Sequence, residues 1–104
     1  MLMRLSKNAF VRQYGPFTYI LNRISNYDQM FANAEVFMRW ITRSPMCKEN
    51  IVANICRVFD GTDASMIASD FDEFIEPLIN EKVILVGETE MELASKDESF
   101  SYDV

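Results

Sequence analysis

Residues 9–31 alternate between apolar and polar positions, a period of two that is typical of β-strands. Phe17, Tyr19 and Leu21 fall on one face of such a run, and Thr18 and Ile20 fall on the other. Residues that favour turns, among them Gly15-Pro16, interrupt the pattern. The pattern predicts a three-stranded antiparallel meander with strands at about 8–14, 17–23 and 27–31.

The apolar period becomes helical after residue 31. Asn33 is a suitable N-cap, and a short apolar stripe that includes Trp40 predicts a first helix ending at Ser44-Pro45. A second helix is expected from about Cys47 to Asp60-Gly61, since glycine commonly ends helices. The run "KVILVG" that begins at Lys82 predicts a last strand or extended segment.

A third helix, capped by Thr62 or Asp63, carries the widest apolar surface of the chain. At 100° per residue its apolar side chains cover an arc of roughly 140°. The carboxylates at Asp70, Asp72, Glu73 and Glu76 fall on the remaining face. Two interpretations remain open: the helix lies deep in a core, or it packs on the domain and also lines a groove.

Charge divides the chain into two parts. Residues 1–87 hold nine Lys/Arg and ten Asp/Glu, a net charge of −1, whereas residues 88–104 hold one lysine and six acids, a net charge of −5. The second segment also has no sustained apolar period. We therefore predict one domain at 1–87, followed by an acidic tail at 88–104 that is disordered or only loosely attached.

Several kinds of chemistry are disfavoured. The 104 residues include no histidine and only two cysteines, Cys47 and Cys56, which do not have the spacing of a zinc site or a CxxC redox motif. No glycine-rich phosphate loop and no nucleophile motif is present. The N-terminal residues do not resemble a secretory signal, and no apolar run reaches the length of a membrane span. We expect a cytoplasmic, non-enzymatic protein with reduced thiols and without a cofactor or metal.

A small sheet with three helices is also typical of winged-helix DNA-binding proteins. Between Asp60 and Glu81, however, there are seven acids and no lysine or arginine, and this charge would repel phosphates from the third helix. The first part of the chain holds most of the basic residues: Arg4, Lys7, Arg12, Arg23, Arg39 and Arg43. Binding of nucleic acid through the third helix is therefore disfavoured, while binding on the sheet side stays open.

The order of three strands and three helices, with almost no spare residues, resembles the PqqD-like family, also called RiPP recognition elements. The resemblance covers about residues 7–86. The matching positions are Phe31-Ala32-Asn33 before the first helix, Trp40 at its end, Asn50-Ile51-Val52 in the second helix, and Phe74-Ile75, Leu78 and Val83-Ile84-Leu85 around the end of the third. The sequence departs from the family pattern at Cys47, Pro77 and Lys82.

The resemblance implies an α+β, winged-helix-like fold in which a three-stranded antiparallel sheet is followed by three helices. It also implies a peptide-binding module of ribosomal peptide natural product biosynthesis, whose partners are a precursor (leader) peptide and a modifying enzyme, usually a radical SAM maturase. In this family the leader adds as a further strand beside the third strand and lies over the third helix. Strand addition suits an edge strand, whose N–H and C=O groups are unpaired.

Transferred to this chain, the resemblance places the peptide site at ten residues. These are Tyr27, Asp28, Gln29, Met30 and Phe31 on the strand, and Ile67, Ala68, Phe71, Phe74 and Ile75 on the helix. Each has a structural alternative: Phe71 and Phe74 as core residues, Tyr27 and Met30 as cover for the sheet, Asp28 and Gln29 as solubilising residues on an edge.

Two other functions remain as alternatives to leader recognition. One is a winged-helix regulator that binds DNA, which would show affinity that falls steeply with salt. The other is a structural protein that associates with itself, since an exposed edge strand can pair with a second copy and form a homodimer.

Overall fold

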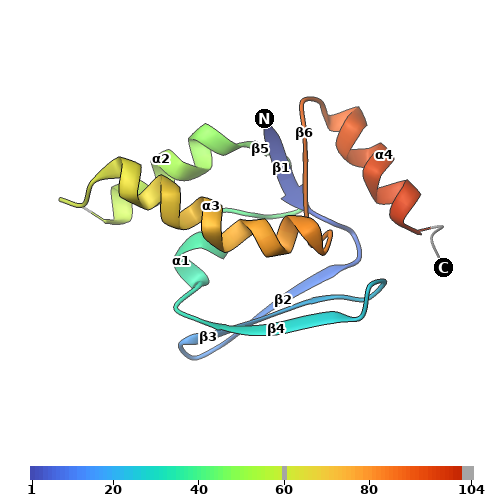
Figure 1. The fold of residues 1–104 in the computed structure, drawn as a ribbon, viewed down its shortest axis with the longest axis horizontal. Coiled ribbons are helices and arrows are strands. Elements are labelled where there is room, and N and C mark those ends of the chain that lie inside the picture. Colours follow the sequence, from blue (N-terminus) through green and yellow to red (C-terminus); the bar gives the residue numbers. More distant parts are fainter. Residues whose placement is uncertain (60, 102–104) are drawn as a thin grey trace.

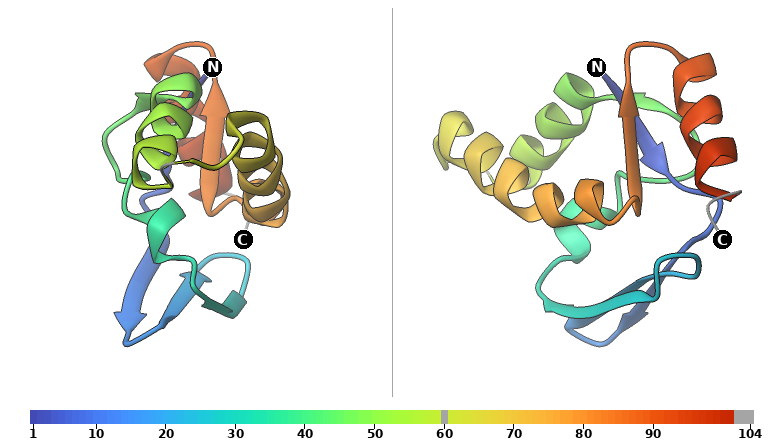
Figure 2. Two further views of the ribbon diagram at one scale, coloured as in Figure 1. Left: turned by 90° about the vertical axis from the view of Figure 1, so that its left-hand side faces the viewer. Right: turned by 45° about the vertical axis from the view of Figure 1, so that its right-hand side comes forward.

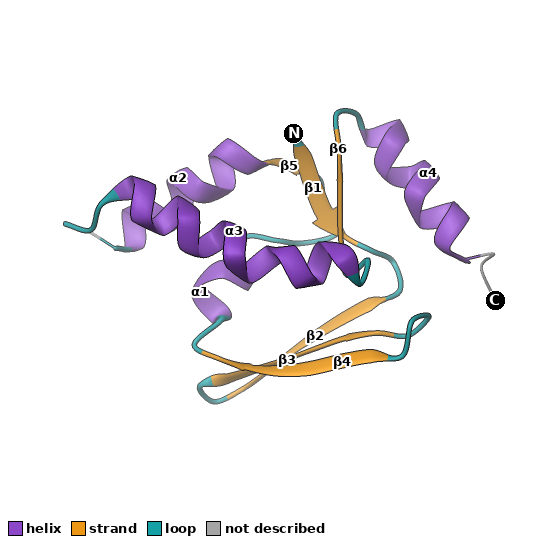
Figure 3. Ribbon diagram, viewed as in Figure 1, coloured by secondary structure: helices purple, strands orange, loops and turns teal. Residues whose placement is uncertain are grey.

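The computed structural model describes residues 1–59 and 61–101. The described chain is an α+β fold with two three-stranded antiparallel sheets and four helices (Figures 1 and 3). This agrees with the predicted α+β class. It differs from the predicted arrangement of one sheet and three helices, because a second sheet and a fourth helix are present.

The first sheet is the predicted meander, in the strand order β2-β3-β4. Its strands are β2 (Ala9–Tyr14), β3 (Phe17–Asn22) and β4 (Tyr27–Ala32), within one residue of the predicted bounds at each end. The alternation in the sequence places Thr18, Ile20 and Asn22 in the interior, each with at most 1% of its surface exposed. The period of two therefore identifies the strand but not its buried face, since the more apolar set, Phe17, Tyr19 and Leu21, lies on the outer side.

The second sheet joins the two ends of the domain. It has the order β5-β1-β6 and consists of β5 (Met46–Cys47), β1 (Leu2–Leu5) and β6 (Ile84–Gly87). Strand β6 is the predicted last strand, whereas β1 and β5 were not predicted. Leu2 lies opposite Gly87, so the pairing of β1 with β6 connects the N-terminal residues to the C-terminal part of the fold.

Two of the three predicted helices form much as expected. They are α2 (Lys48–Val58) and α3 (Ala64–Asn80). The side chain of Asp63 accepts a hydrogen bond from the backbone N–H of Ser65 at 3.0 Å and so caps α3 as predicted. Gly61, at φ 86°, lies in the left-handed region between the two helices, where glycine carries no side-chain strain.

The first helix is much shorter than predicted. Helix α1 covers only Glu35–Met38, and Asn33 is not its N-cap. Asn33 has a φ of 60° and donates its backbone N–H to the carbonyl of Pro16 at 3.0 Å, so it belongs to the end of the sheet. After Met38 the backbone bonds span three residues, from Trp40 to Phe37 and from Ile41 to Met38, and this tighter winding ends the α-helix.

The acidic segment contains a helix, α4 (Glu90–Ser101), where the sequence predicted a disordered or loosely attached tail. Leu93 is fully buried, and Asp97 is only 3% exposed. The Asp97 carboxylate accepts hydrogen bonds from Arg4 Nη1 at 2.8 Å and Ser6 Oγ at 2.7 Å, so α4 is held against β1. Residues 102–104 of the predicted tail lie outside the described residues.

Helix α3 packs against both sheets. Its buried residues Ile67, Phe71, Ile75 and Leu78 belong to the main core, together with residues of β1, β3 and α2. Buried Asn22 at the end of β3 donates its side-chain amide to the carbonyl of Glu81 at 2.8 Å, just after α3. This bond fixes the meander relative to α3, which lies on the side of the molecule where β4 runs (Figure 2).

Candidate functional site

Strand β4 is an edge of its sheet: it pairs with β3 on one side and ends the strand order on the other. In an antiparallel pair, opposing residues alternate between hydrogen-bonded and non-bonded positions. Because Asn33 bonds to Pro16, the bonded pairs follow at every second residue, namely Phe31 with Thr18, Gln29 with Ile20 and Tyr27 with Asn22. The backbone N–H and C=O groups of Asp28, Met30 and Ala32 therefore point away from the sheet.

The other edge of the same sheet is partly covered. The same alternation on β2 directs the Ala9 carbonyl outward, and the guanidinium of Arg43 donates to it. Ala9 is fully buried, whereas Asp28, Gln29 and Met30 on β4 are exposed. Of the two edges, β4 is thus the better candidate for pairing with another strand.

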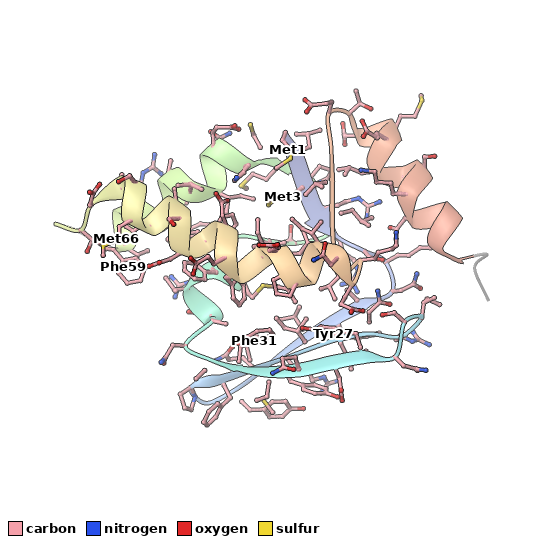
Figure 4. The ribbon with its side chains drawn as sticks, viewed as in Figure 1. Met1, Met3, Tyr27, Phe31, Phe59 and Met66 are labelled. Carbon is pink, nitrogen blue, oxygen red and sulfur yellow. The ribbon has the colours of Figure 1, made fainter. Side chains whose placement is uncertain are left out.

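The five predicted strand residues divide by face. Tyr27 and Phe31 are half-buried and point from β4 toward α3 (Figure 4). Gln29 lies between them on the same face but is exposed. Asp28 and Met30 are on the outer face, where Met30 is 49% exposed. The predicted strand therefore presents both backbone groups and side chains to solvent.

The five predicted helix residues are mostly interior. Ile67, Phe71 and Ile75 are buried, and Phe71 has no exposed surface. Ala68 and Phe74 are half-buried. The wide apolar arc of α3 thus serves mainly as core, and the half-buried Phe74 contacts Phe31 of β4.

Aromatic rings fill the space between β4 and α3. The ring centroids of Phe31 and Phe74 are 5.3 Å apart in an edge-to-face contact, and Phe37 of α1 lies 5.2 Å from Phe74 and 5.7 Å from Phe71. An added strand would therefore lie along the outer edge of β4, with these rings beside it, and would not insert between β4 and α3.

Acidic groups surround this edge. Burial, followed by the charges of Glu81 and Asp28, raises the pKa of Tyr27, so its hydroxyl stays protonated at neutral pH. On the outer face the Tyr19 hydroxyl donates to Asp28 Oδ2 at 2.8 Å, and this hydrogen bond is the main cause that raises the pKa of Tyr19. Both tyrosines are thus hydrogen-bond donors beside a negatively charged edge.

A cavity that sequence reasoning did not predict lies where α1 meets the start of α3. It has a volume of ≈ 140 Å³ and is lined by Phe37, Phe59, Thr62, Ile67 and Asp70. Phe59 and Thr62 belong to the connection between α2 and α3, where no apolar period exists to indicate a site. Only Ile67 of the predicted residues contributes to its wall.

The outer face of the meander carries large apolar side chains in solvent. Phe10, Tyr14, Phe17 and Met30 are 40%, 53%, 46% and 49% exposed, respectively. The register places Tyr14 opposite Phe17 and Tyr19 opposite Met30, so these side chains form one continuous surface that ends at β4. Apolar surfaces of this kind often contact other proteins.

Comparison of the chain with profiles of protein families, with curated proteins and with solved structures finds no match. In residues 1–59 and 61–101, no group of three or more histidine, cysteine or acidic side chains is arranged to hold a metal ion. No helix in the same residues is both long and apolar enough to cross a bilayer.

Proposed function

We propose that this protein is a non-catalytic binding module that recognises the leader of a ribosomally made precursor peptide by strand addition and presents it to a separate modifying enzyme, most simply a radical SAM maturase. The winged-helix-like character of the PqqD-like family is part of this proposal. The observation that carries it is β4, an edge strand whose backbone groups at Asp28, Met30 and Ala32 point away from the sheet and whose side chain Phe31 contacts α3. A peptide gains hydrogen bonds at such an edge without displacing existing ones.

Backbone recognition explains why a binding module of this kind needs no catalytic side chain. The added strand receives its affinity from main-chain hydrogen bonds and its specificity from side chains at alternate positions. Gln29 and Phe31 on the α3 side, and Asp28 and Met30 on the outer side, are placed to contact those positions. The chain contains no histidine, the side chain most often used for general acid–base catalysis near neutral pH.

A titration tests the proposal directly. The probes are synthetic peptides that correspond to the first part of each short reading frame adjacent to the gene, added to the isotope-labelled protein. We expect amide shifts at Asp28, Met30 and Ala32 and in residues 64–75. Shifts confined to other parts of the chain would reject the site, and no binding by any of these peptides would count against the function.

Replacing Met30 by proline should weaken binding of such a peptide at least about tenfold, because it removes an outward N–H and places a ring on the edge. The N–H of Met30 takes no part in the β3 ladder, so the fold should persist; circular dichroism and thermal unfolding check this. Met30→Ala is the matched control: it removes the same side chain but keeps the N–H, and should bind within about threefold of the wild type if backbone pairing carries the affinity. Equal losses in both variants would contradict strand addition.

A homodimer through the same edge is a second candidate, favoured by the continuous apolar surface that ends at β4. We expect the sedimentation coefficient to rise with concentration and to return to the monomer value in Met30→Pro. Addition of a binding peptide should also release the monomer, since both partners require one edge. A constant monomer value at all concentrations would exclude this candidate without affecting peptide recognition.

A further inference from the structure

The geometry points to a basic residue in the bound peptide: a lysine or arginine, N-terminal to the segment that pairs with β4, occupies the cavity at Asp70. This inference rests on the proposed function, since it specifies the peptide that the β4 edge would take.

The cavity has the composition that a long basic side chain requires. Phe37, Phe59 and Ile67 supply apolar walls, and Asp70 supplies a carboxylate. Lysine and arginine place their aliphatic stems on apolar surface and their charge in a polar environment. The volume of ≈ 140 Å³ is about that of one long side chain.

The Asp70 carboxylate is available for such a partner. Within the described residues no lysine or arginine forms an ion pair with it, whereas Asp72 on the same helix is paired with Lys48 at 2.6 Å. Residues 61–81 contain no basic side chain at all. The α3 side of the cavity is therefore negative, which favours a cationic ligand group.

The cavity also has a wall residue, Phe37, in α1, the element that follows β4. Strand β4 runs toward α1, and Phe31 near its end contacts Phe74. Phe37 touches Phe74 and forms part of the cavity wall, so one aromatic cluster links the edge to the cavity. Figure 4 labels the wall residue Phe59 on the left, the side of the molecule toward which β4 runs from Tyr27 to Phe31.

The direction of the strand decides which flank of the peptide reaches Asp70. A strand added antiparallel to β4, as β3 already is, has its N-terminal side next to Ala32. From Phe74 to Ile67 is seven helical residues, or about 10 Å, which about three extended residues span. The basic residue is thus expected about two to four positions before the paired segment.

Selection from a random peptide library displayed on phage tests this inference. The library is selected on the wild type, Asp70→Asn, Asp70→Lys and Glu76→Gln, and only peptides that fail to bind Met30→Pro are counted. Glu76→Gln is the matched control, since it removes one exposed charge from α3 about 120° around the helix from Asp70, at a residue that does not line the cavity. Peptides selected on the wild type and on the control should carry lysine or arginine at one fixed position before an alternating segment. Peptides selected on Asp70→Asn should show no such preference. Those selected on Asp70→Lys should carry aspartate or glutamate at that position.

Affinities of one selected peptide complete the test. Changing its basic residue to glutamine, or Asp70 to asparagine, should each weaken binding about tenfold, and the two changes together should weaken it no further. Edge-dependent peptides without a basic preference, or a preference that survives Asp70→Asn, would overturn this inference and leave the proposed function standing. If every selected peptide also binds Met30→Pro, the proposal of strand addition is wrong, and this inference is wrong with it.

Discussion

Replacing Asp97 by alanine is expected to lower the free energy of unfolding by about 3–5 kcal/mol, because it leaves the buried guanidinium of Arg4 without its counter-charge. The side chains of Arg4 and Asp97 are only 14% and 5% exposed. The same change removes the acceptor of Ser6 Oγ and of the Lys7 backbone N–H. Domains of this size unfold with about 5–15 kcal/mol, so this one contact holds a large part of the stability. Urea unfolding measures the loss.

Two further variants show whether the loss arises from the contact. Ser95→Ala lies on the exposed side of α4 and should change the free energy of unfolding by no more than about 0.5 kcal/mol. The double variant Arg4→Met with Asp97→Leu should recover much of the stability, since an apolar pair leaves no charge unpaired. An Asp97→Ala protein as stable as Ser95→Ala would mean that α4 does not dock on β1 as described.

Replacing Phe71 by alanine is expected to cost about 3–5 kcal/mol of unfolding free energy, because a fully buried ring leaves a cavity that the surrounding helices cannot close. Phe71 packs on Phe37 and belongs to the central core. The milder Phe71→Leu should cost about 1–1.5 kcal/mol and keeps the prediction testable if the alanine variant does not fold. Urea unfolding of both variants provides the measurement.

Variants of Phe71 and Phe74 distinguish the core residues of α3 from those of the peptide site. Phe74→Leu should affect peptide affinity more than stability, since the half-buried Phe74 ring stands beside the β4 edge. Phe71→Leu should do the reverse, with peptide affinity unchanged once the protein is folded. If Phe71→Leu reduced affinity as much as Phe74→Leu, the apolar arc of α3 would be part of the site after all.

The elements that the sequence predicted well are those whose pattern is local. The meander from Ala9 to Ala32 and helix α3 are each defined by a period that a short window contains. The prediction of the first helix was wrong because Asn33, a residue type that often caps helices, donates its backbone N–H to Pro16 of the neighbouring turn. Strand β1 and helix α4 depend on contacts between residues about ninety positions apart, such as Ser6 with Asp97, and no local period records them.

The candidate site likewise has a part that the sequence predicts and a part that only the folded structure shows. The strand was identified from its pattern, and its place at the sheet edge follows from the order of the meander. Which of its backbone groups face outward depends on the pairing of Asn33 with Pro16, which spacing alone does not reveal. The cavity at Asp70 requires Phe37 and Phe59 to meet from different elements, and only the folded chain brings them together.

The position of β1 has a consequence for the synthesis of this protein. The meander needs only residues 9–32, so its hairpins can form while the rest of the chain is still being made. Strand β1 is made first, yet its partner β6 begins at Ile84. Until that segment leaves the ribosome, β1 can pair only with the two residues of β5, and the nascent chain carries an apolar strand with one open edge. Translation that stops before residue 84 should therefore yield fragments that aggregate, even though they contain the whole β4 edge.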